Sequence, residues 1–250
     1  RRDRATVVGM PEIHAGRRRR AQELIRARDA DAALITAGPN VRYLTGLASS
    51  NAAVLLPVSG TGVLATDSRY TLAAQRDCPD LELIVERFIE PRLAAEMTSR
   101  SIRTVAFEAH EMTVERHAEL QAKAVGVSIV PFGRMIEEVR TVKDPSELEL
   151  LATACRISSQ ALADVFALIR PGVTERQLAA ALDRRMVELG ADRPAFDTIV
   201  ASGPNGAIPH HAPADRPMRR GDLITMDFGA LFGGYHADMT RTVAIGAPAG

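Results

Sequence analysis

The sequence predicts an α/β unit followed by an α+β unit, and three observations support this division. Short apolar runs alternate with helical stretches over about the first 140 residues, which is typical of an α/β layer with a central sheet. A helix-capping signal then occurs at Asp144, and two long helical stretches give way to strand-like runs after Pro194. We therefore expect one domain over residues 1–140 and a second domain over residues 144–250.

In the first unit, β-rich runs predict six strands, and helical periodicity predicts three helices between them. The predicted helices are Tyr70–Asp77, Pro91–Arg100 and Thr113–Lys123. The predicted strands are Ala32–Thr36, Ala52–Pro57, Gly62–Thr66, Leu81–Glu86, Thr104–Phe107 and Val127–Val130. Neither of the glycine-rich phosphate-binding motifs occurs, so nucleotide binding is not expected. The run Arg17–Arg20 is interpreted as the solvated start of an amphipathic helix.

In the second unit, two capping boxes mark the starts of two helices. Asp144-Pro145-Ser146-Glu147 combines an N-cap, a proline at the first helical position and a glutamate at the third, and it predicts a helix that reaches Pro171. Cys155 lies among the apolar positions of this helix and is expected in the core. Thr174-Glu175-Arg176-Gln177 starts a second helix that ends at Gly190.

Composition excludes several classes of function. Of the 250 residues, 46% are apolar and 25% are charged, as in an ordinary globular chain, and 31 basic residues balance 31 acidic ones. No nucleic-acid partner is expected, since a phosphate-binding surface usually leaves a basic excess. No run of about 18 apolar residues occurs, so no membrane association is expected. The two cysteines match no metal or redox spacing, which favours a reducing, cytoplasmic location.

The most informative stretch is a predicted hairpin between Gly221 and Val243. Two strand-like runs flank a predicted two-residue loop at Phe232-Gly233. In that register Asp227 lies directly opposite Asp238, with both side chains on one face and Cβ atoms about 5 Å apart. The same alternation places Thr225, His236 and Thr240 on the Asp227 face, and Ile224, Met226 and Phe228 on the core face.

Two opposed carboxylates repel each other unless a positive group or a proton lies between them. A shared proton, an arginine such as Arg241 and a divalent cation are all candidates, and a salt-bridged surface hairpin is a purely structural alternative. Oxygen ligands suit Mn²⁺, Mg²⁺ or Co²⁺, although two carboxylates are too few for a complete site. Upstream, a turn-rich segment ends in His210 and His211. Such a pair is common in surface turns, but a neutral imidazole beside a dicarboxylate can also stabilise developing charge.

The stretch Ala201–Val243 resembles the Xaa-Pro peptidases of the pita-bread metallopeptidase family, which includes prolidases and aminopeptidase P. Asn40–Gly46 and Thr66–Thr71 resemble the creatinase-type N-terminal domain of prolidases, and Val142–Glu147 resembles the junction that follows it. The resemblance implies a creatinase-like α/β N-terminal domain followed by an incomplete α+β pita-bread catalytic domain.

The resemblance also implies roles for particular residues. Asp227 and Asp238 match the first two ligands of a dinuclear site that usually holds Mn²⁺ or Co²⁺, and His210 matches a histidine that contacts substrate near the scissile bond. Thr240 and Arg241 fit an Asp-x-Thr-Arg motif that supports the ligands from behind. The implied reaction is hydrolysis of an Xaa-Pro amide bond by water activated between two metal ions.

The family's remaining ligands, one histidine and two glutamates, would follow Val243, whereas the sequence ends at Gly250. We therefore expect the chain to supply only part of the ligand set. Two functions remain open: a metal-dependent Xaa-Pro dipeptidase or aminopeptidase, and a truncated, non-catalytic relative that acts as a binding or assembly module. The resemblance further implies a proline-containing peptide substrate and a homodimer.

Overall fold

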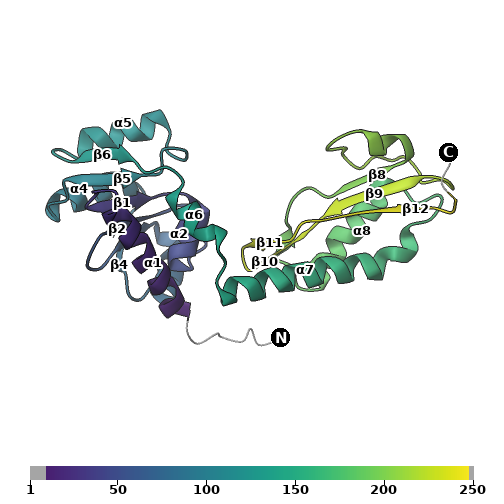
Figure 1. Cartoon of the computed structure of the whole chain (residues 1–250), viewed down its shortest axis with the longest axis horizontal. Helices are drawn as coiled ribbons and strands as arrows, with labels where there is room; N and C mark the ends of the chain where they lie inside the picture. Colours follow the sequence, from purple (N-terminus) through teal and green to yellow (C-terminus); the bar gives the residue numbers. More distant parts are fainter. Residues whose placement is uncertain (1–9, 248–250) are drawn as a thin grey trace. The chain divides into compact units, whose positions relative to one another are not determined.

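The computed structural model describes residues 10–247, and the chain divides into two compact units, Arg1–Val142 and Lys143–Gly250 (Figure 1). The N-terminal unit is built on a central sheet, and the C-terminal unit on two smaller sheets and two long helices. Among the described residues, no helix has the length and apolar character needed to cross a membrane.

The central sheet of the N-terminal unit has six strands in the order β4-β3-β2-β1-β5-β6. Strand β2 is antiparallel to both of its neighbours, whereas the pairs β3–β4, β1–β5 and β5–β6 are parallel. This arrangement confirms the predicted α/β class. The strands are β1 (Ala32–Ile35), β2 (Ala52–Pro57), β3 (Val63–Thr66), β4 (Glu82–Val85), β5 (Thr104–Phe107) and β6 (Ser128–Pro131).

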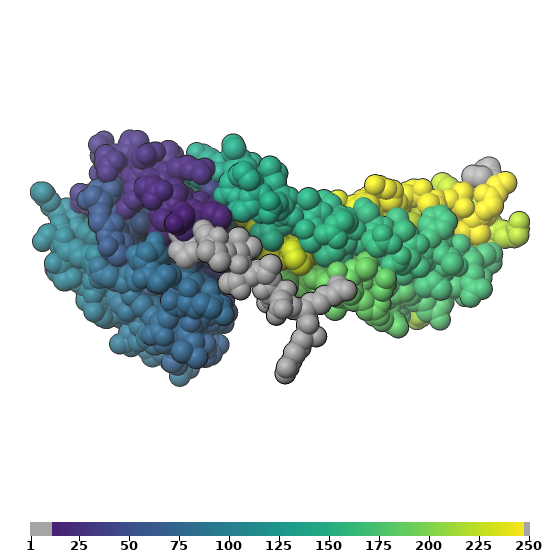
Figure 2. Space-filling view, turned by 90° about the horizontal axis from the view of Figure 1, so that it is seen from below, coloured from purple at the N-terminus to yellow at the C-terminus, as the bar shows by residue number. Residues whose placement is uncertain are grey.

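Helices cover both faces of this sheet. Because successive side chains of a strand point to opposite faces, alternate residues of the strands pack into two separate hydrophobic clusters. Ala33 and Ile35 pack in a cluster with residues of α1, α2 and α6, while Ala32 and Leu34 pack with residues of α4 and α5. The helices are α1 (Met10–Arg26), α2 (Gly38–Thr45), α3 (Thr71–Asp77), α4 (Ile89–Ser99), α5 (Val114–Lys123) and α6 (Met135–Thr141). Helix α1 lies at the surface of the unit, where it is drawn in purple in Figure 2.

Two arginines of α1 are buried, so the predicted solvated helix start is wrong for them. Arg17 and Arg18 are only 4% and 6% exposed. Arg18 donates to the carbonyl of Leu44 at 2.6 Å, and Arg17 donates to the carbonyl of Tyr43 at 3.1 Å. The last carbonyls of a helix lack partners within the helix, and here the guanidinium groups of α1 serve the end of α2.

In the C-terminal unit, α7 (Pro145–Val165) and α8 (Glu175–Glu188) pack against one face of the sheets (Figure 1). Both predicted capping boxes are confirmed, with Asp144 and Thr174 as N-caps. Cys155 is exposed on α7, which corrects its predicted place in the core. The strands are β7 (Arg193–Pro194), β8 (Ile199–Ser202), β9 (Leu223–Phe228), β10 (Ala230–Phe232), β11 (Tyr235–His236) and β12 (Met239–Ala244).

Strands β12, β9 and β8 form one three-stranded sheet, and β11, β10 and β7 form the other. The strand pairs within both sheets are antiparallel. The core face is the predicted one, since Ile224, Met226 and Phe228 have no exposed surface.

The hairpin register differs from the prediction by two residues. Phe232 pairs with Tyr235, so the turn is Gly233-Gly234, and Asp227 lies opposite Thr240 rather than Asp238. Both turn glycines have positive φ, +58° and +87°. A two-residue turn that matches strand twist needs positive φ at both central residues, which glycine adopts readily and phenylalanine does not.

Gly229, between β9 and β10, is expected to tolerate no side chain. A Cβ atom there would lie 1.9 Å from the carbonyl oxygen of Ala237. Gly229→Ala should therefore force the two backbone segments apart and lower the free energy of unfolding by about 2 kcal/mol or more. Urea unfolding followed by far-UV circular dichroism measures this change. Gly206→Ala is the matched control, because a Cβ at Gly206 meets no atom within 4 Å; equal stability of the two variants would contradict the prediction.

Candidate metal and substrate site

Asp227 lies on the face of β9 that points away from α7 and α8. It is half-buried, and Thr240 Oγ1 donates to its Oδ1 at 2.8 Å. This bond leaves the second carboxylate oxygen, Oδ2, without a hydrogen-bond partner among the described residues. Asp227 therefore presents an oriented, hard oxygen donor at the open face of the sheet.

Asp238 immediately precedes β12 and is exposed. Its neighbours Ala237 and Met239 are turned toward the core, so Asp238 lies on the same side as Thr240. The observed register makes Asp238 a diagonal neighbour of Asp227, and such positions are about 7 Å apart. Within residues 10–247, no side chain forms a hydrogen bond or ion pair with the Asp238 carboxylate. The two aspartates share a face, although they are not a directly opposed pair.

Arg241 does not lie between the two aspartates. It pairs with Met226 and therefore leaves the strand on the face opposite to Asp227. Its guanidinium donates to the carbonyl of Thr240 at 2.7 Å. Arg241, one of the three candidates for neutralising the carboxylates, is therefore not placed to do so, and its observed contact is with the backbone of β12.

The donor chemistry of this face fits a divalent cation in part. Carboxylate oxygens are the ligands that Mn²⁺ and Mg²⁺ prefer, and among residues 10–247 no cationic side chain forms an ion pair with Asp227 or Asp238. In the described part of the chain, however, no group of three or more His, Cys, Asp or Glu side chains is placed to hold a metal ion. The two aspartates therefore supply part of a ligand set.

The predicted substrate histidine, His210, lies on a loop that follows β8. The loop begins with the 3₁₀ helix η3 (Gly203–Ala207) and returns to the body of the unit at Ala214. His210 is exposed and has a φ of +54°, which is uncommon for a residue with a side chain. The loop thus projects the imidazole of His210 into solvent, whereas the next residue, His211, is only 13% exposed.

A buried carboxylate that sequence reasoning missed closes this loop. Glu175, the first residue of α8, has no exposed surface. Its oxygens accept five hydrogen bonds, from the backbone and hydroxyl of Ser202 at 2.7 and 2.6 Å, Asn205 at 2.9 Å, His211 at 2.8 Å and the backbone of Ala214 at 3.0 Å. The only sequence signal was its place after the N-cap Thr174, which indicated a helix start and no more.

Hydrogen bonding keeps Glu175 ionised in spite of its burial. Burial alone would raise the pKa of this carboxyl group, but the bonds from Ser202, His211, Ala214 and Asn205 outweigh it and lower the pKa to about 2. The group is therefore a buried negative charge at neutral pH, compensated by donors from both ends of the loop.

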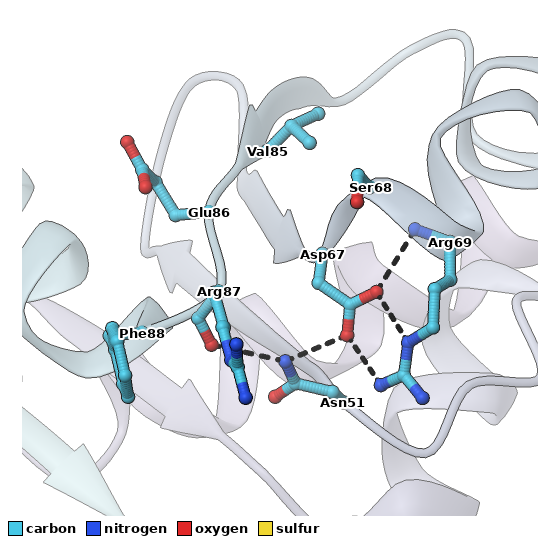
Figure 3. A pocket seen from close by; sticks show the side chains of 8 residues that line it. All are labelled: Asn51, Asp67, Ser68, Arg69, Val85, Glu86, Arg87 and Phe88. Atoms are coloured by element: carbon cyan, nitrogen blue, oxygen red, sulfur yellow. Dashed lines mark hydrogen bonds and ion pairs between the residues drawn. The ribbon is translucent and has the colours of Figure 1, made fainter.

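A second polar region lies in the N-terminal unit, at the ends of the parallel strands β3 and β4. A hollow of about 610 Å³ separates the segment Asp67–Arg69 from the segment Val85–Phe88, with Asn51 between them (Figure 3). Asp67 accepts two bonds from the guanidinium of Arg69, at 2.9 and 2.7 Å, and one from Asn51 at 2.9 Å. These contacts hold the pKa of Asp67 well below its usual range.

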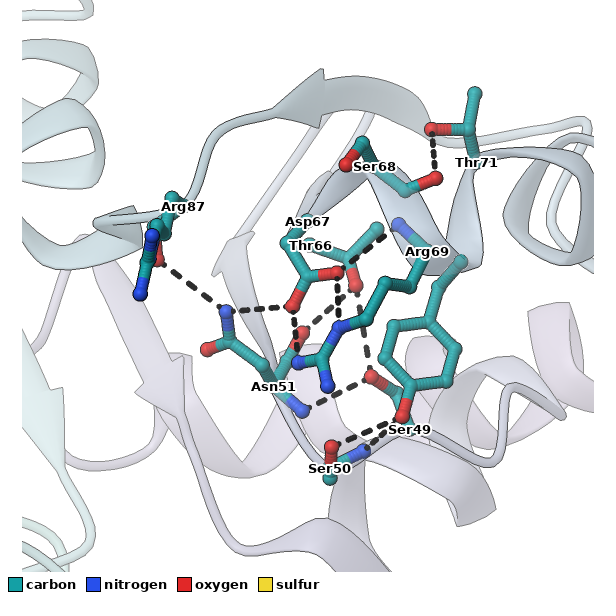
Figure 4. A network of polar contacts seen from close by, with 10 residues as sticks. Ser49, Ser50, Asn51, Thr66, Asp67, Ser68, Arg69, Thr71 and Arg87 are labelled. Atoms are coloured by element: carbon teal, nitrogen blue, oxygen red, sulfur yellow. Dashed lines mark hydrogen bonds and ion pairs between the residues drawn. The ribbon is translucent and has the colours of Figure 1, made fainter.

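The Thr66–Thr71 motif is thus largely occupied by bonds among its own residues and with Ser49–Asn51 (Figure 4). The Tyr70 hydroxyl bonds both the backbone and the hydroxyl of Ser50, at 3.2 and 2.9 Å. Thr66 Oγ1 donates to the Asn51 carbonyl at 2.7 Å. The motif therefore has a structural role, which is to fasten the loop before β2 to the end of β3.

Two known protein families together match nearly all of the described chain. Residues 17–142 match the creatinase/prolidase N-terminal domain, and residues 149–250 match metallopeptidase family M24. The first match alone spans half of the chain.

The chain belongs to the prolidase-like pita-bread metallopeptidase family.

Relatives within this family include an uncharacterised peptidase, YqhT, of Bacillus subtilis, 36% identical over 220 residues, and an Xaa-Pro dipeptidase of Pyrococcus horikoshii, 31% identical over 227 residues. These alignments cover 87% of this chain in both cases, and 62% and 61% of the respective relatives. Among solved structures, an Xaa-Pro dipeptidase from Bacillus anthracis superposes with a TM-score of 0.89 at 28% identity, over 94% of this chain and 66% of the other. The chain therefore spans about three fifths of the length of the curated relatives that it matches.

The ionised state of Glu175 predicts a pH-dependent contribution to stability. Its pKa falls from 4.5 to about 2 on folding, so the stabilisation is present above pH 4.5 and is lost as the pH falls toward 2. At pH 7, Glu175→Gln should lower the free energy of unfolding by an amount on the order of 3 kcal/mol. Urea unfolding at several pH values measures the difference. The difference in free energy of unfolding between the parent and Glu175→Gln should become smaller as the pH falls from 4.5 to 2. A difference that does not change with pH would contradict this explanation.

The structural role of Asp67 predicts that its replacement loosens the loop before β2. Asp67→Asn removes the charge that aligns Arg69 and should lower the melting temperature of the chain. Asp77→Asn is the matched control, because Asp77 also pairs with a neighbouring arginine, Arg76, but its side chain is 28% exposed, whereas that of Asp67 is 8% exposed. Differential scanning calorimetry should give a clearly larger decrease for Asp67→Asn; similar decreases would argue against the role assigned to the motif.

Proposed function

We propose that the protein takes part in metal-dependent hydrolysis of Xaa-Pro bonds in peptides, as a dipeptidase or an aminopeptidase P-type enzyme. The observation that carries the proposal is the pair Asp227 and Asp238 on one open face, within a chain of the M24 family. Two relatives named Xaa-Pro dipeptidase and two named putative Xaa-Pro aminopeptidase support the substrate class.

The proposed roles follow from where each side chain lies. Asp227 and Asp238 would hold Mn²⁺ or Co²⁺, and Thr240 would fix the orientation of Asp227 through its hydrogen bond to Oδ1. When bound, the divalent ions supply Lewis-acid polarisation of the scissile carbonyl group. His210, exposed on its loop, would contact the substrate near the scissile bond. Arg241 would act indirectly, by holding the backbone of β12 at Thr240.

The same residues allow a second function of a different class. Because the described residues provide only two ligands, the chain would also suit a non-catalytic module that binds a proline-containing peptide or assembles with another chain. This alternative predicts peptide binding without hydrolysis. A homodimer in the cytoplasm remains a further prediction; the two free cysteines agree with a reducing environment.

Metal binding tests the proposed site without requiring catalysis. Electron paramagnetic resonance of added Mn²⁺ measures free and bound metal, and the chain should bind it weakly because it offers only two carboxylates. Asp227→Asn and Asp238→Asn should each weaken binding by about tenfold or more. Asp215→Asn, which removes an 80% exposed aspartate elsewhere in the unit, should leave binding unchanged. Equal binding by all four proteins would overturn the assignment of the site.

Proline release then separates the two functions. Release from an Xaa-Pro dipeptide that requires Mn²⁺ and is lost in both aspartate variants would support the peptidase. Binding of the same dipeptide, measured by calorimetry, with no release at saturating Mn²⁺ would favour the binding module.

A further inference from the structure

The two adjacent histidines of the loop after β8 lie in opposite environments. His210 is exposed, with its backbone in the left-handed region, whereas the side chain of His211 is 13% exposed and its Nε2 lies 2.8 Å from Oε2 of Glu175. His210, whose φ is positive, is thus the residue immediately before His211, whose imidazole is largely buried. The conformation at His210 is unfavourable for a residue with a Cβ, so contacts around it must hold it in place.

The contact with Glu175 also fixes the proton on His211. An ionised carboxylate accepts hydrogen bonds and has no proton to donate. Since Glu175 is ionised at neutral pH, the bond requires a proton on Nε2 of His211. That nitrogen has no free lone pair, so it is available neither as a metal ligand nor as a general base. The chemistry of the pair therefore assigns different tasks to the two histidines.

Glu175 holds both ends of the loop at one point. Ser202 and Asn205 reach it from the outgoing side, and His211 and Ala214 reach it from the returning side. Backbone bonds reinforce the closure, since Glu175 N donates to Arg216 O and Arg176 N donates to Ala214 O. His211 is the contact nearest to His210 in this network, and among the described residues of the returning segment it is the one whose side chain hydrogen-bonds to Glu175.

We propose that Glu175 and His211 form a latch that positions His210. In this role His211 is a positioning residue: its imidazole docks on the start of α8, and the chain reversal at His210 then directs the neighbouring side chain outward. The structural part of the proposal stands on the contacts of the loop. Its consequence for catalysis rests on the proposed function, in which His210 meets the peptide substrate.

Three variants of the full chain test the latch. His211→Ala removes the donor, whereas His211→Gln keeps an N–H group at nearly the same distance from the backbone. Asp215→Asn is the matched control, because it breaks the exposed ion pair with Arg176 on the same returning segment. Far-UV circular dichroism verifies that each variant is folded before the loop is compared.

The first readout is the loop itself. Limited proteolysis within residues 203–214 should become about tenfold faster or more in His211→Ala, and should stay close to the parent rate in His211→Gln and Asp215→Asn. Nuclear magnetic resonance of the imidazole groups should give a slowly exchanging Nε2–H proton for His211 in the parent and in Asp215→Asn. The ring signals of His210 should shift in His211→Ala and return toward the parent in His211→Gln.

These measurements do not depend on hydrolysis, so they separate the latch from the proposed function. Unchanged proteolysis in His211→Ala, or a loosened loop with unchanged His210 signals, would overturn the latch. Where the parent releases proline, a latch that positions a substrate contact should lower kcat/KM in His211→Ala, with recovery in His211→Gln. A parent that releases no proline while the loop responds as expected would contradict the proposed function and leave the latch supported.

Discussion

One buried charge in the C-terminal unit, the carboxylate of Glu175, joins the start of α8 to the loop after β8. Taking a carboxylate out of water costs several kcal/mol unless donors replace the lost water. Here the donors come from β8, from η3 and from the returning segment of the loop, so the cost is offset only when all of these segments are in place. The charge therefore couples helix, sheet and loop in one arrangement, and it is the loop of this arrangement that carries His210.

The N-terminal unit also contains a buried glutamate that accepts several hydrogen bonds from a neighbouring loop. Glu108, which is 1% exposed, follows β5 and accepts hydrogen bonds from the backbone of Thr36 and Ala37 at 2.6 and 2.7 Å, and from Asn40 at 2.5 Å. These donors lie where β1 ends and α2 begins, so the carboxylate joins the ends of two parallel strands to the next helix. In both units a buried glutamate fixes a chain reversal that apolar packing alone would leave free to vary.

The candidate site depends on the strands as well as on the loop. The core face of β9 is fully buried against the helices, which forces Asp227 to the opposite face. The Gly233-Gly234 turn determines which residue of β12 lies opposite Asp227. That residue is Thr240, which donates a hydrogen bond to the Asp227 carboxylate. Asp238 then lies diagonally from Asp227, on the face of the sheet opposite to α7 and α8. In the part of the chain that the structure describes, no cationic side chain pairs with Asp227 or Asp238, which is consistent with a ligand set completed by other groups.

The sequence by itself determined the fold class, the two capping boxes, the core face of β9 and the motifs that identify the family, because each of these depends on residues that are close in the chain. Only the tertiary structure decided the register of the hairpin, the burial of Arg17 and Arg18, and the role of Glu175. The register was missed because a displacement of two residues keeps the same alternation of faces, so only the turn geometry of the two glycines distinguishes the alternatives. Glu175 was missed because its donors lie between 27 and 39 residues away, and a periodic pattern carries no information about such contacts.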